Sequence, residues 1–216
     1  MAIRPQLALG ACVFALAGAA GAVPPTQERV LELCASVDGP AHCGRRVEAE
    51  QLKSLPNLAV REGDTLRVSL YPSGTRAFVD TAAGSSEKSY ALWDYWSPVN
   101  AIVLLVTSGD EVGYAVLQRA TGQLTALPAE PVLAPDRQHA AVADFCPERC
   151  TNEITVWRIT REGLRKDASL KPATPWSDVT VGWKSGETLT IQFTPAGSDK
   201  PQTTERRLTD REWQRP

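Results

Sequence analysis

Residues 90–127, YALWDYWSPVNAIVLLVTSGDEVGYAVLQRATGQLTAL, contain four short runs of aliphatic, aromatic and β-branched residues. Turn-forming residues separate the runs at Ser97-Pro98, Gly109-Asp110 and Thr121-Gly122. Short runs of this composition bounded by turn residues predict β-strands, and turns this short predict that neighbouring strands pair antiparallel. We therefore expect an antiparallel sheet of four strands over this segment.

Two later segments repeat this order of turn and strand. Pro135-Asp136 opens the second unit and Ser185-Gly186 opens the third. The strands predicted for these units are residues 139–145, 154–159, 164–170, 188–193 and 203–208. Repetition every ~40 residues of units with about four strands is typical of β-propeller blades.

The turns resemble those of WD-type β-propeller blades in exported bacterial proteins, in which a Ser-Pro-Asp-Gly turn precedes an apolar strand and a glycine turn closes a hairpin. The matching residues are Ser97-Pro98, Pro135-Asp136, the run from Trp183 to Gly186, and Thr121-Gly122. This resemblance covers about residues 90–195 and implies four-stranded sheets set side by side. A closed propeller typically has at least four blades, so three such units imply an incomplete or small propeller-like array.

The segment before residue 90 divides into a helical part and a hairpin. Val30, Leu33, Cys34 and Val37 have helical spacing behind a potential N-cap at Thr26, and a second helix is expected from about Arg45 to Ser54. Alternation around Leu66 followed by Pro72-Ser73-Gly74 predicts a hairpin, which supplies a partial fourth sheet. We expect an N-terminal helical segment over residues 23–56 that covers a sheet edge, and a mainly β domain over residues 57–216.

The first 22 residues have the pattern of a secretion signal. Arg4 precedes an apolar stretch, and Ala20-Gly21-Ala22 is a small-residue cleavage site before Val23. Lipidation at Cys12 is the alternative, but most of the strongly apolar residues follow Cys12, so simple cleavage is favoured. We predict a periplasmic or secreted protein without a membrane span.

The charge of the chain excludes some partners. The net charge is −2, and removal of residues 1–22 takes away Arg4 and no other charge, which leaves −3. A mildly acidic chain with scattered Lys and Arg lacks the basic patch expected for binding to nucleic acid.

Four cysteines follow the signal segment, and an even number in an exported chain predicts two disulfides. The sequence allows three pairings, of which local pairing is the simplest: Cys34 with Cys43, and Cys146 with Cys150. A thioredoxin-like motif has two residues between its cysteines, and the two histidines do not complete a zinc set. We therefore expect structural disulfides, with no metal and no cofactor.

Few residues suggest catalysis. His42 and His139 have no nucleophile motif beside them, and carboxylates near predicted strand ends are ordinary turn residues. These carboxylates are Asp80, Asp94, Asp110, Glu111 and Asp144.

The aromatic residues are more suggestive of binding. Alternation places Trp93 and Tyr95 on one face of a strand and Trp96 on the other, so one ring near solvent would be free to contact a sugar or a protein. Packing between sheets is the favoured role for these rings, and Trp213 is assigned to a tail.

The leading hypothesis is an exported, non-enzymatic module that binds a protein or an envelope glycan through its loops. A hydrolase using Asp94, Asp144 and His139 is one alternative. The other is an inhibitor that inserts the Cys146–Cys150 loop, with Glu148 and Arg149 at its tip, into a partner.

Overall fold

The computed structural model describes residues 25–81 and 87–216. The expected signal segment, with Cys12, lies outside these ranges. Two helices come first, α1 (Gln27–Cys34) and α2 (Pro40–Ser54). The strands are β1 (Ala59–Glu62), β2 (Thr65–Ser69), β3 (Thr75–Val79), β4 (Ser89–Trp96), β5 (Ala101–Ser108), β6 (Glu111–Gln118), β7 (Gln123–Leu127), β8 (Pro131–Leu133), β9 (His139–Asp144), β10 (Glu153–Thr160), β11 (Gly163–Leu170), β12 (Trp176–Ser185), β13 (Thr188–Pro195) and β14 (Gln202–Arg207).

The strands form four antiparallel sheets, and each strand pairs with its neighbours in the sequence. Sheet 1 holds β1–β3, sheet 2 holds β4–β7, sheet 3 holds β8–β11 and sheet 4 holds β12–β14. The prediction of a mainly β array with an N-terminal helical pair is confirmed. Sheets 1 and 4 have three strands instead of four. Helix α2 precedes sheet 1, and the chain leaves sheet 4 after β14.

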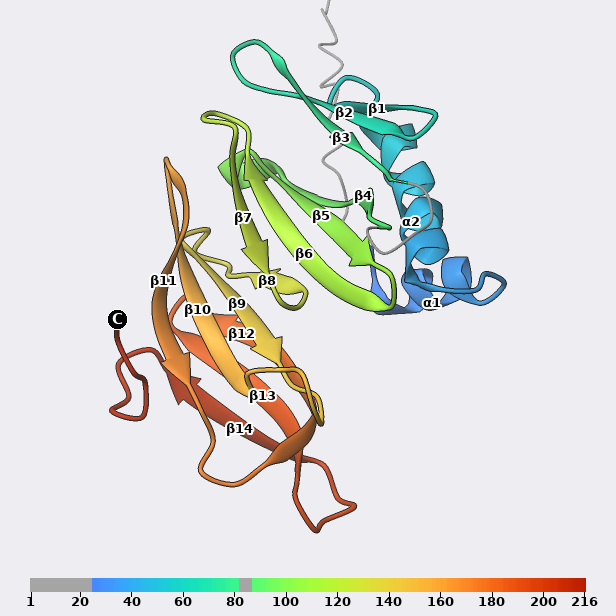
Figure 1. Ribbon diagram of the computed structural model, residues 1–216. Helices are drawn as coiled ribbons and strands as arrows, with labels where there is room; N and C mark the ends of the chain where they lie inside the picture. The colour runs from blue at the N-terminus through green and yellow to red at the C-terminus, as the bar shows by residue number, and fades with distance from the viewer. Residues whose placement is uncertain (1–24, 82–86) are drawn as a thin grey trace, which may run out of the picture.

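The four sheets stack face to face in the order of the sequence, as the colours of Figure 1 show. Leu66 of sheet 1 packs in the same apolar cluster as Leu104 of sheet 2. On its other face, sheet 2 shares a cluster with sheet 3 that includes Val142. Sheets 3 and 4 share the third cluster, which includes Val156 and Ile191. Each inner sheet is therefore buried on both faces, and its strands are accordingly rich in apolar residues.

Sheet 4 ends the row because its outer face is polar. Thr190, Gln192 and Glu205 lie opposite the face that carries Ile191, so this face offers little apolar surface to a fifth sheet. The segment after β14 instead folds back across sheet 3, where Gln214 pairs with Ser169. This return buries Trp213 between sheets 3 and 4, so the assignment of Trp213 to a tail was wrong.

The two helices begin in different ways, α1 with a side-chain cap and α2 with a proline in its first turn. The Thr26 hydroxyl accepts a hydrogen bond from the backbone N–H of Arg29 at the start of α1 (3.2 Å). The second helix begins at Pro40, five residues earlier than the predicted Arg45, because proline is well suited to the first turn of a helix. Of the helices in the described ranges, none is both long enough and apolar enough to cross a membrane.

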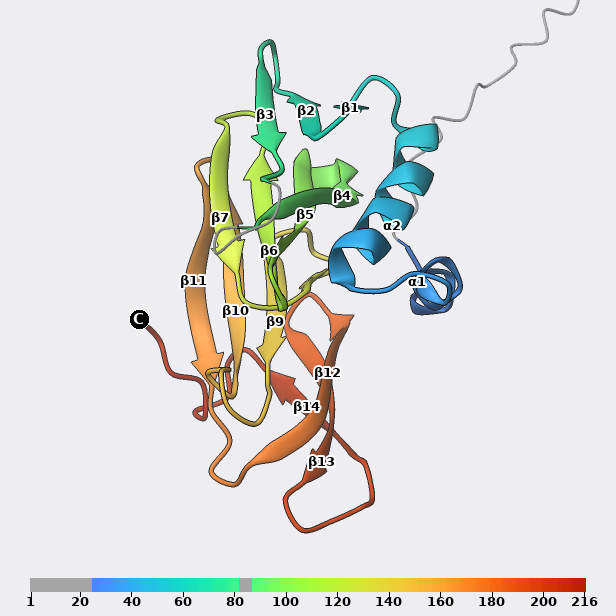
Figure 2. The same cartoon turned by 45° about the vertical axis from the view of Figure 1, so that its right-hand side comes forward.

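Helix α2 covers the free edge of β4, which confirms the expected role of the helical pair (Figure 2). The Glu48 side chain on α2 is only 3% exposed, and it accepts a hydrogen bond from the backbone N–H of Leu92 (2.9 Å). Asp80 accepts one from the backbone N–H of Tyr90 (2.9 Å). These carboxylates satisfy edge groups that another strand would otherwise pair, which protects the edge from association.

Two arginines balance the charge of these carboxylates. Arg61 donates from Nε and Nη2 to the two oxygens of Glu48 (2.8 and 2.7 Å). Arg45 bridges Glu48 and Asp80. We call Arg45, Glu48, Arg61 and Asp80 the edge network. Because every member has an opposite charge beside it, burial of Glu48 is compensated.

Both disulfides pair locally, as the simplest of the three pairings predicted. Cys34 and Cys43 have Cα atoms 4.9 Å apart, and Cys146 and Cys150 have Cα atoms 5.3 Å apart. The first disulfide joins α1 to α2, and the second closes the loop between β9 and β10. Two disulfides fit an oxidising extracellular compartment.

Replacing Cys34 and Cys43 together by serine is expected to free α1. A helix of eight residues is unstable alone, and loss of the cross-link should cost about 2–3 kcal/mol. Hydrogen exchange should show loss of protection in α1, while the amides of sheets 2 and 3 remain protected. The matched variant lacking Cys146 and Cys150 should leave α1 protected. Uniform loss of protection across the sheets would contradict a local role for the first disulfide.

Candidate functional site

An extra residue in β4 determines the orientation of its side chains. Leu92 pairs with Leu104 of β5, whereas Asp94 pairs with Val103, so Trp93 is inserted into the ladder. Such a bulge lets two successive residues face the same side. Trp93 consequently packs with Trp96 against sheet 3, and the prediction that Trp93 and Tyr95 share a face was wrong.

The aromatic residues of β4 have packing contacts on both faces of sheet 2. Trp93 and Trp96 are 6% and 5% exposed in the cluster between sheets 2 and 3. Tyr95 packs on the opposite face with the cluster shared by sheet 1. Its hydroxyl donates to the side-chain oxygen of Asn100 (3.2 Å), and Arg119 lies over its ring. Trp96 also borders a hollow.

That hollow lies at the seam between sheets 2 and 3 and has a volume of about 510 Å³. Asp94 and Trp96 of β4 line one side, and Glu130 lines the other. Prolines, one arginine and three aliphatic residues complete the wall, namely Pro98, Pro131, Pro135, Arg137, Val132, Leu133 and Ala134. We call this hollow the seam pocket. Its proline residues restrict the backbone on both sides, and its volume lies in the range of small-ligand sites.

Asp94 is the most unusual residue of the seam pocket. Asp94 is only 8% exposed, and this burial raises the pKa of its carboxyl group to about 6. The backbone N–H of Tyr95 (2.7 Å) and the Trp96 side chain donate hydrogen bonds that oppose this rise, while Glu130 adds to it. Asp94 therefore carries a charge at neutral pH that the fold does not fully compensate.

Glu130 is held at the rim by a neighbouring indole. The Nε1–H of Trp93 donates to Glu130 Oε1 (2.7 Å). Burial, with a contribution from Glu130, also raises the pKa of Tyr114, whose ring stands edge-on to Trp93. Arg137, exposed at the opposite rim, makes no ion pair with the described residues. The charged groups that line the pocket are thus two carboxylates and one unpaired guanidinium.

The residues proposed for hydrolysis do not converge. His139 is the first residue of β9 and Asp144 is the last, which places their backbones ~16 Å apart in an extended strand. Asp144 is already bonded to the N–H and hydroxyl of Thr151 (both 2.8 Å). The hydrolase alternative was therefore wrong in its choice of residues, because a β-strand separates its members.

His139 instead connects a turn to sheet 4. Its Nδ1 lies 2.8 Å from Asp136 Oδ2, and its ring stacks on Trp183. Although burial alone would raise the pKa of Asp136, hydrogen bonds from Gln138 and His139 lower it. This arrangement is a folded turn with satisfied partners, so it does not suggest a general base.

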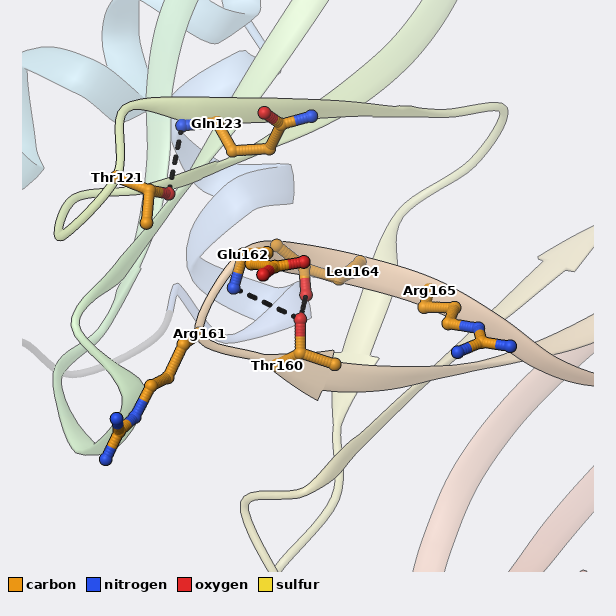
Figure 3. Close-up of a pocket in the computed structure, with 8 residues that line it drawn as sticks. Thr121, Gln123, Thr160, Arg161, Glu162, Leu164 and Arg165 are labelled. Atoms are coloured by element: carbon orange, nitrogen blue, oxygen red, sulfur yellow. Dashed lines mark hydrogen bonds between the residues drawn. The ribbon is translucent and has the colours of Figure 1, made fainter.

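A second hollow lies between two hairpin turns and has a volume of about 640 Å³. Figure 3 shows that its hydroxyls bond within their own turns: Thr121 to the N–H of Gln123, and Thr160 to Glu162 and Gly163. The side chains of Arg161 and Arg165 point away from each other. Its polar groups therefore do not converge on a common point.

A third hollow, of about 690 Å³, extends from the face of sheet 2 turned toward sheet 1 to the β9–β10 loop of sheet 3. Several residues singled out in the sequence border it, namely Asp110, Glu111, Asp144, Arg149 and Cys150. Arg149 and Glu111 form an ion pair across it (3.3 Å), but their side chains are 76% and 69% exposed. Such a pair contributes little energy. Glu148 is exposed at the loop tip and does not line the hollow.

Sequence reasoning found Asp94 and Trp96 but missed Glu130 and Arg137. The run Leu127-Pro128-Ala129-Glu130-Pro131 contains the only available signal, an acidic residue held between prolines. Within residues 25–81 and 87–216, no three His, Cys, Asp or Glu side chains gather as a metal site.

Comparison with protein-family models and with curated proteins found no match to this chain.

Proposed function

We propose that the chain is an exported binding module whose seam pocket accepts a positively charged group of its partner. The observation that carries this proposal is Asp94, a buried carboxylate at the edge of a hollow, held where its ionisation costs stability. Buried charges without a full set of partners are concentrated at functional sites. A residue that served packing alone would be expected to be apolar at this position.

The charges of the pocket favour a cationic ligand. Asp94 on β4 and Glu130 in the β7–β8 loop line the hollow against a single exposed arginine, Arg137, and Trp96 supplies an aromatic surface beside them. An ammonium group between carboxylates forms charge-assisted hydrogen bonds, and an indole also attracts cations. Lysine side chains and the free amines of amino sugars carry this group, which agrees with a protein or an envelope glycan as partner.

Two further features support an exported module. The two disulfides suit an oxidising compartment, and residues 1–22 have the pattern of a cleaved signal. The serial four-stranded and three-stranded sheets agree with a relationship to propeller-like repeat proteins, in which loops on a rigid scaffold bind partners. The scaffold role itself requires no reactive group.

Calorimetric titration at pH 7.5 tests the proposal with two pairs of probes. Nα-acetyl-lysine amide and glucosamine carry a charged amine, whereas their N-acetylated counterparts do not. We expect the charged probes to bind and the acetylated ones to bind at least tenfold more weakly. Asp94→Asn should weaken binding of the charged probes at least tenfold, because it removes the buried negative charge.

Asp199→Asn is the matched control, since Asp199 lies exposed in the loop between β13 and β14. This variant should bind like the wild type. Equal binding of charged and acetylated probes, or unchanged binding by Asp94→Asn, would contradict the proposal. A preference for lysine over glucosamine would identify a protein partner, and the reverse would identify a glycan.

A further inference from the structure

The hollow on the sheet 1 side of sheet 2 exists because sheet 1 is too short to cover its neighbour. Strands β1–β3 have four or five residues, whereas β4–β6 have eight. Within the described residues, the strip that sheet 1 leaves uncovered includes Tyr90, Val106, Leu124 and Ala126, with the buried Ala115 at its floor. We call this strip the sheet 2 groove.

Small residues make the groove deep enough to receive side chains. Ala115 of β6 pairs with Ala126 of β7, and Gly113 pairs with Val106 of β5. Ala126 is exposed, while Val106 and Leu124 are half-buried at its sides. Because these alanines and the glycine have small side chains or none, and larger residues flank them, the groove leaves room for aliphatic groups of a partner.

The groove also borders a strand with one open side. β7 is the last strand of sheet 2, and within the described residues its only strand partner is β6. The opposite edge of this sheet is covered by α2 and the edge network. An extended peptide beside β7 would gain backbone hydrogen bonds and place alternate side chains on the groove face of the sheet, next to Ala126.

The two basic residues that line the groove have contacts within the protein, since Lys88 lies over the Tyr90 ring and Arg149 pairs with Glu111. The charge that remains specifies what else the peptide carries. Asp110, at the tip of the β5–β6 hairpin, is exposed and has no bonding partner within the part of the chain that the structure describes. The nearby Asp144 is already bonded to Thr151. Asp110 lies five residues before Ala115 on the hairpin, or ~16 Å in a strand. A basic residue about five positions from an aliphatic one would meet it.

We propose that the sheet 2 groove binds an extended segment of a partner protein along β7, with aliphatic side chains beside Ala126 and a basic side chain at Asp110. This site lies on the opposite face of sheet 2 from the seam pocket and does not use Asp94. The bound segment must be extended because the floor of the groove is the face of a sheet, and the open edge beside it is the strand β7.

Fluorescence polarisation with labelled peptides tests this inference. The first peptide alternates Val and Thr over seven residues and ends in two Lys. The second ends in two Glu, and the third ends in two Lys but has Pro at its centre. We expect the first to bind at least tenfold more tightly than the other two. Proline removes a backbone donor from the strand, and glutamate is repelled by Asp110.

Ala126→Arg should abolish this binding by filling the groove, and Ala77→Arg is its matched control. Both alanines are exposed on edge strands, Ala126 on β7 and Ala77 on β3, so both variants should fold. Asp110→Asn should reduce the preference for the Lys-ended peptide at least threefold. The same titrations in an Asp94→Asn background should give the same result, which excludes lysine bound in the seam pocket.

Several results would overturn the inference. These are equal binding of the three peptides, retained binding by Ala126→Arg, or loss of binding only in Asp94→Asn. A dimer in the wild type that disappears in Ala126→Arg would assign the groove to a second copy of the chain instead. Failure of the lysine and glucosamine probes would leave these peptide results unaffected, so the two proposals fail separately.

Discussion

Replacement of Glu48 by alanine is expected to lower the free energy of unfolding by about 3–5 kcal/mol. The change leaves Arg61 buried without its bidentate partner and the N–H of Leu92 without an acceptor. This is a large part of the ~5–15 kcal/mol that stabilises a typical domain. Urea unfolding followed by tryptophan fluorescence measures it, and the freed edge of β4 should also produce concentration-dependent oligomers.

The Glu50→Ala variant provides the control on the same helix. Glu50 pairs with Lys53 and Arg29 on the exposed side of α2, so its loss should leave unfolding within error of the wild type. Arg61→Ala should resemble Glu48→Ala, and the double variant should lose less than the sum of the two. Additive losses would show that Glu48 and Arg61 stabilise the fold independently, contrary to a shared edge network.

Asp94→Asn is expected to stabilise the protein at neutral pH by about 1–3 kcal/mol, since each pKa unit corresponds to ~1.4 kcal/mol. The pKa of Asp94 is about 6 in the folded chain against 3.8 for an unperturbed group. The folded state therefore binds this proton more tightly than the unfolded state. The contribution of Asp94 to stability is highest below pH 4, falls between pH 4 and 6, and stays low above pH 6.

The measurement is the difference in unfolding free energy between Asp94→Asn and the wild type across pH 4–8. The contributions of the other carboxylates to the unfolding free energy are the same in both proteins and cancel in this difference. The difference should grow from pH 4 and level off above pH 6. Asp199→Asn, with its side chain in solvent, is the control. A difference that is constant with pH, or a loss of stability in Asp94→Asn, would show that the carboxylate is not a cost to the fold. Stabilisation together with loss of amine binding would show that stability is sacrificed for function.

Much of the architecture was predictable because its signals are local. The turns at Ser97-Pro98, Thr121-Gly122 and Gly163 punctuate short apolar runs, so strands β4–β7 and β9–β11 were located within a few residues. The Thr26 cap and the spacing of Cys34 and Cys43 likewise involve residues within ten positions of one another. Strands β1, β8 and β12 were missed. β1 has four residues and β8 has three, whereas the run from Trp183 to Gly186 was taken as a turn although Trp183–Ser185 belong to β12.

The candidate sites were only partly predictable because they join distant residues. Asp94 and Trp96 stood out in the sequence, but Glu130 reaches Trp93 across 37 positions. Glu111 and Arg149 were singled out separately, and only the stacking of sheet 2 on sheet 3 brings the hairpin to the disulfide loop. The hydrolase set failed because residues near in the sequence, His139 and Asp144, lie at opposite ends of one rigid strand.

The sequence by itself located most strands of sheets 2 and 3, favoured local pairing of the cysteines, and showed that a helical pair precedes the sheets. These properties depend on turn chemistry and on side-chain periodicity over a few residues. Only the tertiary structure decided that Trp93 is an extra residue in β4, since a bulge is a mismatch between two strands and not a property of one. That mismatch turns the Asp94 side chain toward sheet 3. Packing of sheet 3 on sheet 2 excludes the water that would otherwise keep the pKa of Asp94 low, and this packing is not a property of the local sequence.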